Sequence, residues 1–358
     1  MTRVASFSVD YVQHLSPSGE LVGAHKTDLA TDFDKIKSLY KLMVMTRIFD
    51  AKAISLQRTG KLGTYASCLG HEAIHVAIGA AMKHEDVFAP MYREYGAQLY
   101  RGVKMSEVLL YWGGDEQGSN FSGPAHDFPW CVPIATQNMH AAGAALAFKL
   151  RKEPRCAVTV IGDGGSSKGD FLESINAASA FKLPMVLVIV NNGWAISVPR
   201  KKQSSGQTLA QKGIAGGLPS IQVDGNDLFA VHEVMSKALE RARNGGGATV
   251  IEAITYRLSD HTTADDASRY RPKEEVENAR KFEPILRLRQ YLMNQNQWSV
   301  QQENTLIEEC KGKVEEAVQE YLNAPKPKVT DMFDYMYADL PHDLQEQRKY
   351  AQELENNG

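Results

Sequence analysis

The stretch AVTVIGDGGSSKGDFLESINAASAFKLPMVLVIVNNGWAIS, residues 157–197, decides the fold of this 358-residue chain. Residues 158–161 and 186–190 are β-branched runs that are too short and too apolar for exposed helices, and they are typical of buried parallel strands. Between them, apolar residues recur at helical spacing over residues 171–178, so one face of a helix packs on the sheet. The stretch therefore predicts a strand, a helix and a second strand parallel to the first.

Polar residues follow each predicted strand where it ends. The first strand is followed by Gly162, Asp163, Gly164 and Gly165, and the second by Asn191 and Asn192. Both sets lie at the carboxyl edge of the sheet, where open α/β folds bind ligands. The glycines let backbone N–H groups approach a phosphate, and the following helix points its positive end at the same place. The carboxylate, the amide oxygen and a nearby main-chain carbonyl form the all-oxygen set that Mg²⁺ takes, so we predict a bound metal diphosphate.

The spacing of the two polar sets matters more than either set. Alone, Gly-Asp-Gly is usually a turn and Asn-Asn a loop start. Together, with the 26 residues 165–190 between them, they match the thiamin diphosphate fingerprint. The sequence has neither a G-x-G-x-x-G following a strand nor a G-x-x-x-x-G-K-[ST], so the common nucleotide-binding motifs fit less well.

Five further segments carry a resemblance to one family. They are MYREYG (91–96), PIATQ (133–137), NNGWAIS (191–197), IQVDGND (221–227) and YRLSDHTTADDASRYR (256–271). With the fingerprint, they resemble the α subunit of the heterotetrameric 2-oxo acid dehydrogenase E1 component, of pyruvate or branched-chain type. The resemblance covers residues 35 to 345 approximately. It implies the diphosphate-binding half of the thiamin diphosphate fold.

The resemblance implies a set of site residues. The cofactor contacts are Tyr92, Arg93, main-chain atoms near Val132 and Ile134, Gly162, Asp163, Gly164, Gly165, Asn192, Trp194, Ile196 and His261. The Mg²⁺ ligands are Asp163, Asn192 and the backbone carbonyl of Trp194. A potassium ion is a further candidate, at Cys131, Thr136 and Gln137, although Thr136 and Gln137 also suit a helix N-cap. Side chains near residues 62–65 and the partner chain are expected to set the substrate.

His261 is the candidate catalytic residue. A lone histidine is more often structural, but this one follows a predicted strand, residues 250–256, and lies in a polar loop that resembles the family's active-site loop. A near-neutral pKa would let it take part in proton transfer. We expect Arg257, Asp266 and Arg271 to form ion pairs that fold this loop.

Two other stretches resemble sites at first sight. Residues 71–75 read H-E-A-I-H, a literal match to the zinc motif H-E-x-x-H, but no third ligand is placed for it and a packing helix is the better interpretation. Residues 113–131 lack periodicity and form a loop long enough to suggest function. Only His126 offers a titratable imidazole there.

Composition sets the broad class. Hydrophobic residues make up 43% and charged residues 23% of the chain, and the formal net charge is −3, so we expect a soluble globular protein that binds no nucleic acid. The cysteines have no C-x-x-C spacing, which favours free thiols in a reducing compartment. No signal segment and no run of 18 apolar residues occurs, so a cytoplasmic, bacterial-type location without membrane contact is predicted.

Strands and helices alternate along the middle of the chain, which predicts an α/β fold with a doubly wound, mostly parallel sheet. We divide the chain into an N-terminal arm (1–33), a thiamin diphosphate-binding α/β domain (34–272) and a C-terminal helical region (273–358). The arm is expected to be extended over the body or a neighbour, and the C-terminal region to form subunit contacts.

The resemblance implies an activity and partners. Thiamin diphosphate carries the chemistry of 2-oxo acid decarboxylation, for which the protein fixes the diphosphate and orients the pyrimidine. The carboxylate that activates the pyrimidine is not expected in this chain, because residues 1–161 look too helical to supply a second sheet domain. An E1 β subunit in an α₂β₂ tetramer and a lipoyl-bearing E2 acyltransferase are therefore implied. Pyruvate is the favoured substrate. A branched-chain or acetoin dehydrogenase is the alternative, and a catalytically silent assembly subunit is the third hypothesis.

Overall fold

The structure is a computed structural model, and it describes residues 1–23 and 27–357. The chain forms two compact units, Met1–Val318 and Gln319–Gly358. Residues 24–26 of the predicted arm and residue 358 of the predicted C-terminal region lie outside the described residues. The candidate site lies entirely in the first unit.

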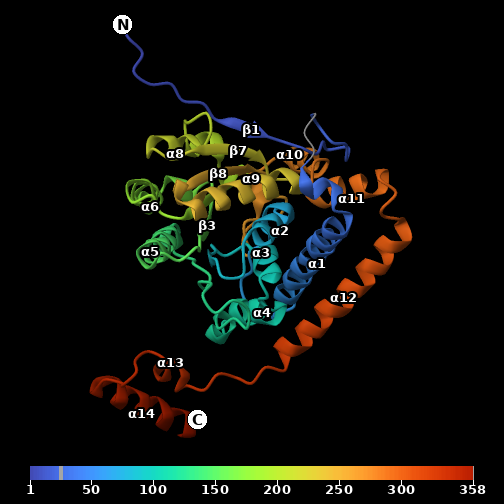
Figure 1. Cartoon of the computed structure of the whole chain (residues 1–358). Coiled ribbons are helices and arrows are strands. Elements are labelled where there is room, and N and C mark those ends of the chain that lie inside the picture. Colours follow the sequence, from blue (N-terminus) through green and yellow to red (C-terminus); the bar gives the residue numbers. More distant parts are fainter. Residues whose placement is uncertain (24–26, 358) are drawn as a thin grey trace. The chain divides into compact units, whose positions relative to one another are not determined.

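A six-stranded parallel sheet forms the centre of the first unit (Figure 1), with strand order β1-β7-β8-β4-β3-β2. The strands are β1 (Asp10–Val12), β2 (Val87–Ala89), β3 (Ala157–Gly162), β4 (Met185–Asn191), β7 (Ser220–Asp224) and β8 (Thr249–Ile254). A two-stranded antiparallel hairpin, β5 (Trp194–Ala195) and β6 (Val198–Pro199), follows β4. The predicted α/β fold with a parallel sheet is confirmed.

Helices connect and cover the strands of the first unit, and further helices form the second unit. They are α1 (Phe33–Arg58), α2 (Glu72–Ala81), α3 (Tyr95–Tyr100), α4 (Met105–Gly113), α5 (Thr136–Arg151), α6 (Gly169–Ala180), α7 (Arg200–Gln203), α8 (Gln211–Ala215), α9 (Leu228–Arg241), α10 (Lys273–Arg280), α11 (Pro284–Asn294), α12 (Val300–Leu322), α13 (Asp331–Asp334) and α14 (His342–Asn357). Shorter turns are η1 (Asp28–Thr31), η2 (Glu116–Ser119), η3 (Gly165–Ser167), η4 (Ala242–Gly246) and η5 (Ala267–Arg269). The Asp32 side chain accepts a hydrogen bond from the Lys35 backbone N–H at 3.0 Å and so caps the N-terminus of α1.

The side chains of successive residues in the central strands point to opposite faces of the sheet. Val158 and Val160 of β3 pack with α1, α2, α9 and α11, whereas Ala157 and Ile161 pack with α5 and α6. This division follows from the two-residue period of a strand, and burial on both faces explains why β3 is apolar except at Thr159, whose hydroxyl donates to the Ala89 carbonyl at 3.1 Å. Figure 1 shows α5 and α6 on one side of the sheet and α1 and α2 on the other. The sheet is therefore doubly wound, as predicted.

The register of the sheet brings the two polar sets together. Gly162, the last residue of β3, pairs with Val190 of β4, and Asn191 pairs with Ile254 of β8. Asp163 and Asn192 follow β3 and β4 directly, so they leave adjacent strands at the same edge. This is the edge at which ligands bind in open parallel sheets.

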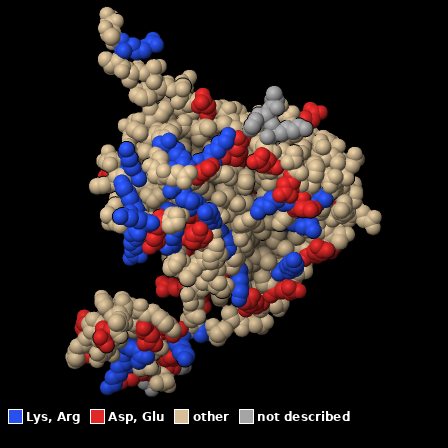
Figure 2. Space-filling model, viewed as in Figure 1, with Lys and Arg blue, Asp and Glu red and all other residues tan. Residues whose placement is uncertain are grey.

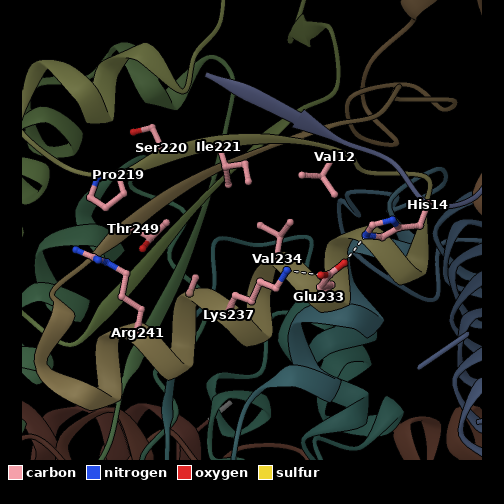
Figure 3. Close-up of a pocket in the computed structure, with 11 residues that line it drawn as sticks. Val12, His14, Pro219, Ser220, Ile221, Glu233, Val234, Lys237, Arg241 and Thr249 are labelled. Atoms are coloured by element: carbon pink, nitrogen blue, oxygen red, sulfur yellow. Dashed lines mark hydrogen bonds and ion pairs between the residues drawn. The ribbon is translucent and has the colours of Figure 1, made fainter. Parts of the chain in front are cut away.

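The N-terminal arm contributes a strand that the sequence analysis did not predict. Strand β1 pairs in parallel with β7 and forms one edge of the sheet. The Asp227 carboxylate accepts hydrogen bonds from the backbone N–H groups of His14 and Leu15, both at 2.6 Å. Beside β1, Glu233 of α9 contacts both His14 and Lys237 at the edge of a shallow groove (Figure 3). Residues 10–15 of the arm therefore lie on the body of their own chain.

The division between the two compact units falls inside α12. Helix α11 belongs to the first unit, where Arg287 forms an ion pair with Asp224 at 2.6 Å and the Tyr291 ring meets Phe229 edge-on. The second unit contains α13 and α14, which are joined by an ion pair between Asp334 and Arg348 at 2.6 Å. The contacts therefore divide the chain at residues 318 and 319, whereas the predicted boundary fell at residue 272.

The surface and the cysteines are consistent with the composition. Basic and acidic side chains are interspersed over the viewed face of the molecule (Figure 2). All four cysteines are buried and free. Within residues 1–23 and 27–357, no helix combines the length and the apolar character that crossing a bilayer requires.

Candidate active site

A cavity of about 630 Å³ lies at the carboxyl edge of β3 and β4. The structure brings all of the predicted cofactor-binding residues to its wall, namely Tyr92, Arg93, Val132, Ile134, Gly162, Asp163, Gly164, Gly165, Asn192, Trp194, Ile196 and His261. They come from five separate segments of the chain. Cys131, Thr136 and Gln137 do not line this cavity.

Asp163 is the first residue with the properties of a cation ligand. It is buried, and its Oδ1 accepts a hydrogen bond from the Gly164 backbone N–H at 2.8 Å. Its Oδ2 is also buried and has no hydrogen-bond partner among the described residues. Burial raises the pKa of this carboxyl to about 6, although the Gly164 N–H and the positive charge of Arg257 stabilise the carboxylate and lower the pKa. A buried carboxylate oxygen without a partner fits a bound Mg²⁺, which would supply the missing positive charge.

Asn192 supplies the second oxygen. Its Oδ1 accepts a hydrogen bond from the Trp194 backbone N–H at 3.2 Å, and its Nδ2 lies 3.1 Å from His71 Nε2. By contrast, Asn191 donates from Nδ2 to Glu252 at 2.7 Å and belongs to the sheet rather than the cavity. The Trp194 carbonyl accepts from Arg257 at 3.4 Å, which leaves it a second lone pair. The donor set therefore fits the predicted Mg²⁺ ligands.

The glycines form a cradle that side chains would fill. A Cβ atom at Gly164 would lie 2.6 Å from the Ala195 Cβ, and one at Gly165 would lie 2.8 Å from the Ile134 Cγ2. Both distances are far below a van der Waals contact, so only glycine fits without displacing a wall of the cavity. Ile196, which also lines the cavity, has a φ of 54°, a left-handed conformation that a β-branched residue rarely adopts. Close backbone approach and backbone strain therefore both occur in the wall of the cavity.

Arg93 joins two segments that flank the cavity. It is buried, and it donates to the Ser67 carbonyl and, at 3.1 Å, to the His261 carbonyl. Its Nη2 also lies 3.4 Å from His261 Nδ1, and its guanidinium lies 5.3 Å from the centre of the Tyr92 ring. A guanidinium has five N–H donors, and these contacts use three, so donors remain for an anion.

His261 lies at the cavity with its imidazole next to Arg93. Burial, with the positive charges of Arg93 and Arg257, lowers the pKa of His261 to about 4. We expected a near-neutral pKa, and the value is lower because the ring is buried and the positive charges of Arg93 and Arg257 oppose its protonation. In this state the imidazole is neutral at pH 7. A bound diphosphate would oppose the effect of the two arginines and move the pKa upward.

The loop after β8 is ordered by contacts other than the ion pairs we expected. Arg257 donates to the Ile196 carbonyl at 3.0 Å and to the Tyr270 hydroxyl at 2.7 Å. Arg271 donates to the carbonyls of Arg257 and Ser259. Asp266 instead pairs with Arg269, at 3.3 Å on the surface. The expected ion pair is therefore present for Asp266, whereas the expectation is wrong for Arg257 and Arg271, because both arginines hold backbone carbonyls.

The H-E-A-I-H segment forms the start of a packing helix. Glu72 accepts from Arg47 at 2.8 Å and from the Gly70 N–H at 3.0 Å, and the rings of His71 and His75 stack with centres 5.7 Å apart. No group of three His, Cys, Asp or Glu side chains in the described part of the chain is arranged to hold a metal ion. The packing interpretation fits these contacts, and the zinc motif does not.

The candidate potassium residues are not part of the cavity wall. The Gln137 Nε2 donates to the Val160 carbonyl at 2.7 Å, whereas its Oε1 is buried without a partner among the described residues. The Cys131 thiol contacts the Pro133 carbonyl at 3.2 Å. Thr136 begins α5 after Ala135, whose φ is 73°, and no side chain caps this helix. A potassium ion here stays a prediction.

Several residues of the cavity wall were not predicted as site residues. They are Met91, Trp112, Ala195, Val198, Gln203 and Thr262. Gln203 of α7 donates to the Gly164 carbonyl at 2.9 Å and so supports the glycine cradle. Thr64, within the stretch 62–65 that was expected to influence the substrate, also lines the cavity. His126, from the long loop, is exposed and does not line it.

Glu94 makes the stability of this region dependent on pH. It is buried behind Arg93, its Oε2 accepts from the backbone N–H groups of Met91 (2.8 Å) and Arg93 (3.3 Å), and burial raises its pKa to about 7. Because this folded-state pKa lies above the ordinary value of 4.5, the folded chain holds the proton more tightly than the unfolded chain. The stabilisation that protonated Glu94 gives the folded chain is complete below pH 4.5, and it falls by about 3 kcal/mol as the pH rises to 7 and above.

Glu94→Gln is therefore expected to raise the melting temperature at pH 8 and to flatten its dependence on pH between 5 and 8. The amide oxygen can accept both backbone N–H groups without carrying a buried charge. Thermal unfolding at both pH values measures the effect, with the exposed Glu240→Gln as the control. A Glu94→Gln protein that melts below the wild type at pH 8 would contradict this account.

A parallel sheet with a polar, glycine-lined cavity at its carboxyl edge defines the class of α/β proteins that bind a phosphate-bearing cofactor at that edge. Within this class, the chain belongs to the dehydrogenase E1 component family, whose model matches residues 40–330. The pyruvate dehydrogenase E1 component subunit alpha of Staphylococcus aureus is 40% identical over 348 residues, which cover 97% of this chain and 94% of that protein. The protein of the same name from Acholeplasma laidlawii is 42% identical over 318 residues, covering 88% and 92%. The predicted family is confirmed.

Proposed function

We propose that this chain is the E1 α subunit of a pyruvate dehydrogenase complex. Together with its β subunit, it would catalyse the thiamin diphosphate-dependent decarboxylation of pyruvate and the transfer of the acyl group to the lipoyl group of an E2 acyltransferase. The observation that carries the proposal is the cavity in which Asp163, Asn192 and Arg93 meet beside a glycine cradle. Relatives named pyruvate dehydrogenase E1 component subunit alpha, similar over nearly the whole chain, support pyruvate as the substrate.

The residues of the cavity divide the work of holding the cofactor. Asp163, Asn192 and the Trp194 carbonyl would hold Mg²⁺, and Arg93 and Tyr92 would hold the diphosphate. When bound, thiamin diphosphate supplies the nucleophilic carbon and the electron sink for loss of CO₂. His261, which is held in place by Arg93, can exchange a proton with a group beside the diphosphate.

The rim of the cavity favours a partner subunit. Val132, Ile196 and Val198 line the cavity and are 51%, 54% and 42% exposed. Apolar side chains at the edge of a polar site are typical of surfaces that another protein covers. We propose that the E1 β subunit covers this rim in an α₂β₂ tetramer and contributes the carboxylate that activates the pyrimidine. The potassium ion and the cytoplasmic location remain predictions from the sequence.

Co-production of this chain with the E1 β subunit of the same organism tests the proposal. The purified tetramer, with thiamin diphosphate, Mg²⁺ and an artificial electron acceptor, is expected to release CO₂ from pyruvate faster than from 3-methyl-2-oxobutanoate. A preference for 3-methyl-2-oxobutanoate would show that the substrate is a branched-chain 2-oxo acid and not pyruvate. Equal inactivity of an assembled tetramer on both substrates would overturn the proposed function.

A further inference from the structure

We propose that His71 is a positioning residue that fixes the orientation of the Asn192 side-chain amide, so that its oxygen and not its nitrogen is presented to the bound cation. The inference rests on the proposed function, because it assigns a role toward the Mg²⁺ of that site. It starts from an unusual feature of the second candidate ligand: a buried histidine contacts its amide nitrogen.

The Cys68 carbonyl, His71, Asn192 and the Trp194 N–H form a network of hydrogen bonds. Its Cys68 end fixes the position of the proton on His71. The imidazole is buried, and its Nδ1 lies 3.1 Å from the Cys68 carbonyl oxygen, which can only accept a hydrogen bond. Nδ1 therefore carries the proton, and Nε2 carries a lone pair. This lone pair faces Asn192 at 3.1 Å and accepts a hydrogen bond from the amide Nδ2.

The contact between Trp194 and Asn192, at the other end of the network, independently gives the same orientation of the Asn192 amide. The Trp194 backbone N–H can only donate, and it lies 3.2 Å from the Asn192 atom assigned as Oδ1. A rotated amide would place its oxygen against the Nε2 lone pair and its NH₂ against the Trp194 N–H. Both contacts would then be repulsive. The Cys68 carbonyl and the Trp194 N–H thus determine which His71 nitrogen carries the proton and which way the Asn192 amide points.

The orientation matters because the two ends of an asparagine amide have nearly the same shape but opposite chemistry. Mg²⁺ takes oxygen ligands, and an amide nitrogen in the same place would point N–H groups at the cation. Hydrogen bonds from outside the ligand set commonly orient ligands in this way, and their loss typically lowers metal affinity about 10- to 100-fold. His71 acts on the cation only through Asn192.

His71 has a neighbour that shares its residue type and its burial but not its contact with Asn192. His71 immediately precedes α2 and stacks on His75 of the next helical turn, with ring centres 5.7 Å apart and planes inclined by 12°. His75 is equally buried, but neither of its ring nitrogens has a hydrogen-bond partner among the described residues. The two histidines therefore share burial and stacking, whereas only His71 contacts Asn192. His75 offers a matched control.

The experiment uses the intact α₂β₂ tetramer with thiamin diphosphate and measures the affinity for Mn²⁺, a paramagnetic substitute for Mg²⁺, from the free-ion electron paramagnetic resonance signal. His71→Leu removes the acceptor and is expected to weaken Mn²⁺ binding about 10- to 100-fold. His71→Gln, which restores a side-chain oxygen as acceptor and an N–H as donor, is expected to recover most of the affinity. His75→Leu is expected to leave it unchanged. His71→Met replaces His71→Leu if the latter does not assemble.

A double-mutant cycle separates positioning from packing. Asn192→Asp presents an oxygen at either end, so His71→Leu is expected to cause no further loss of affinity in that background. Wild-type affinity in a folded His71→Leu tetramer, or an equal loss in His75→Leu, would overturn the inference. If Asn192→Ala also binds Mn²⁺ as well as the wild type, the error lies in the proposed cation site itself. The failure of the inference and that of the proposed function are therefore distinguishable.

Discussion

Asp163→Ala is expected to abolish cofactor-dependent activity and the stabilisation of the tetramer by thiamin diphosphate and Mg²⁺. The substitution removes a buried carboxylate whose Oδ2 has no partner among the described residues. Cofactor at a hundred times its dissociation constant stabilises a wild-type protein by about 2.7 kcal/mol, and the variant is expected to gain none of this. Activity is expected to fall by at least about 100-fold, since a direct ligand matters no less than a group outside the ligand set.

The cofactor-free variant is expected to melt at or above the wild-type temperature. Burial of Asp163 raises its pKa to about 6, so the ionised carboxylate is unfavourable in the empty site at neutral pH. Thermal unfolding of the tetramer with and without cofactor measures both effects. Asp170→Ala, which removes a half-buried carboxylate of the nearby α6, serves as the control. Undiminished cofactor affinity in Asp163→Ala would rule out Asp163 as a cation ligand.

Arg93→Gln is expected to raise the dissociation constant for thiamin diphosphate about 100-fold. One hydrogen bond to a charged group contributes about 1.5 to 3 kcal/mol, and each 1.4 kcal/mol is a factor of ten in affinity. The substitution also removes the links to the Ser67 and His261 carbonyls, so the loop after β8 loses one of its anchors. Titration of the tetramer with cofactor, followed by tryptophan fluorescence, measures the change.

A second variant distinguishes charge from geometry at this position. Arg93→Lys keeps the positive charge but cannot donate to two carbonyls and a phosphate from one planar group. Its affinity is expected to lie between those of the wild type and Arg93→Gln. A dissociation constant within about twofold of the wild type in Arg93→Gln would show that the diphosphate is held elsewhere.

The central part of the fold was predictable because its signals are local. The two apolar runs of the βαβ unit lie within β3 and β4, which extend only one residue further at each end. Burial on both faces imposes an uninterrupted apolar pattern, which a short window of sequence reveals. Strand β1 has no such signal. Its three residues are mostly polar, and its partner β7 lies more than 200 residues away.

The site was predictable where residue type and spacing were enough. Asp163 and Asn192 follow strands, so the topology alone places them side by side. The hydrogen-bond partners of Arg257, in contrast, are carbonyls of other segments, and sequence cannot distinguish them from carboxylates. The contact between His71 and Asn192 spans 121 residues and joins two stretches that share no motif. Such contacts depend on the packed structure and not on any local pattern.

The place of β1 also bears on the order in which the protein can be completed. A ribosome makes residues 10–12 before β7, to which they attach, because β7 spans residues 220–224. Strand β1 must therefore remain unpaired while the roughly 200 residues up to β7 are synthesised, and bringing together segments so distant in sequence is slow. The strand that is made before its partner is thus expected to join the sheet late.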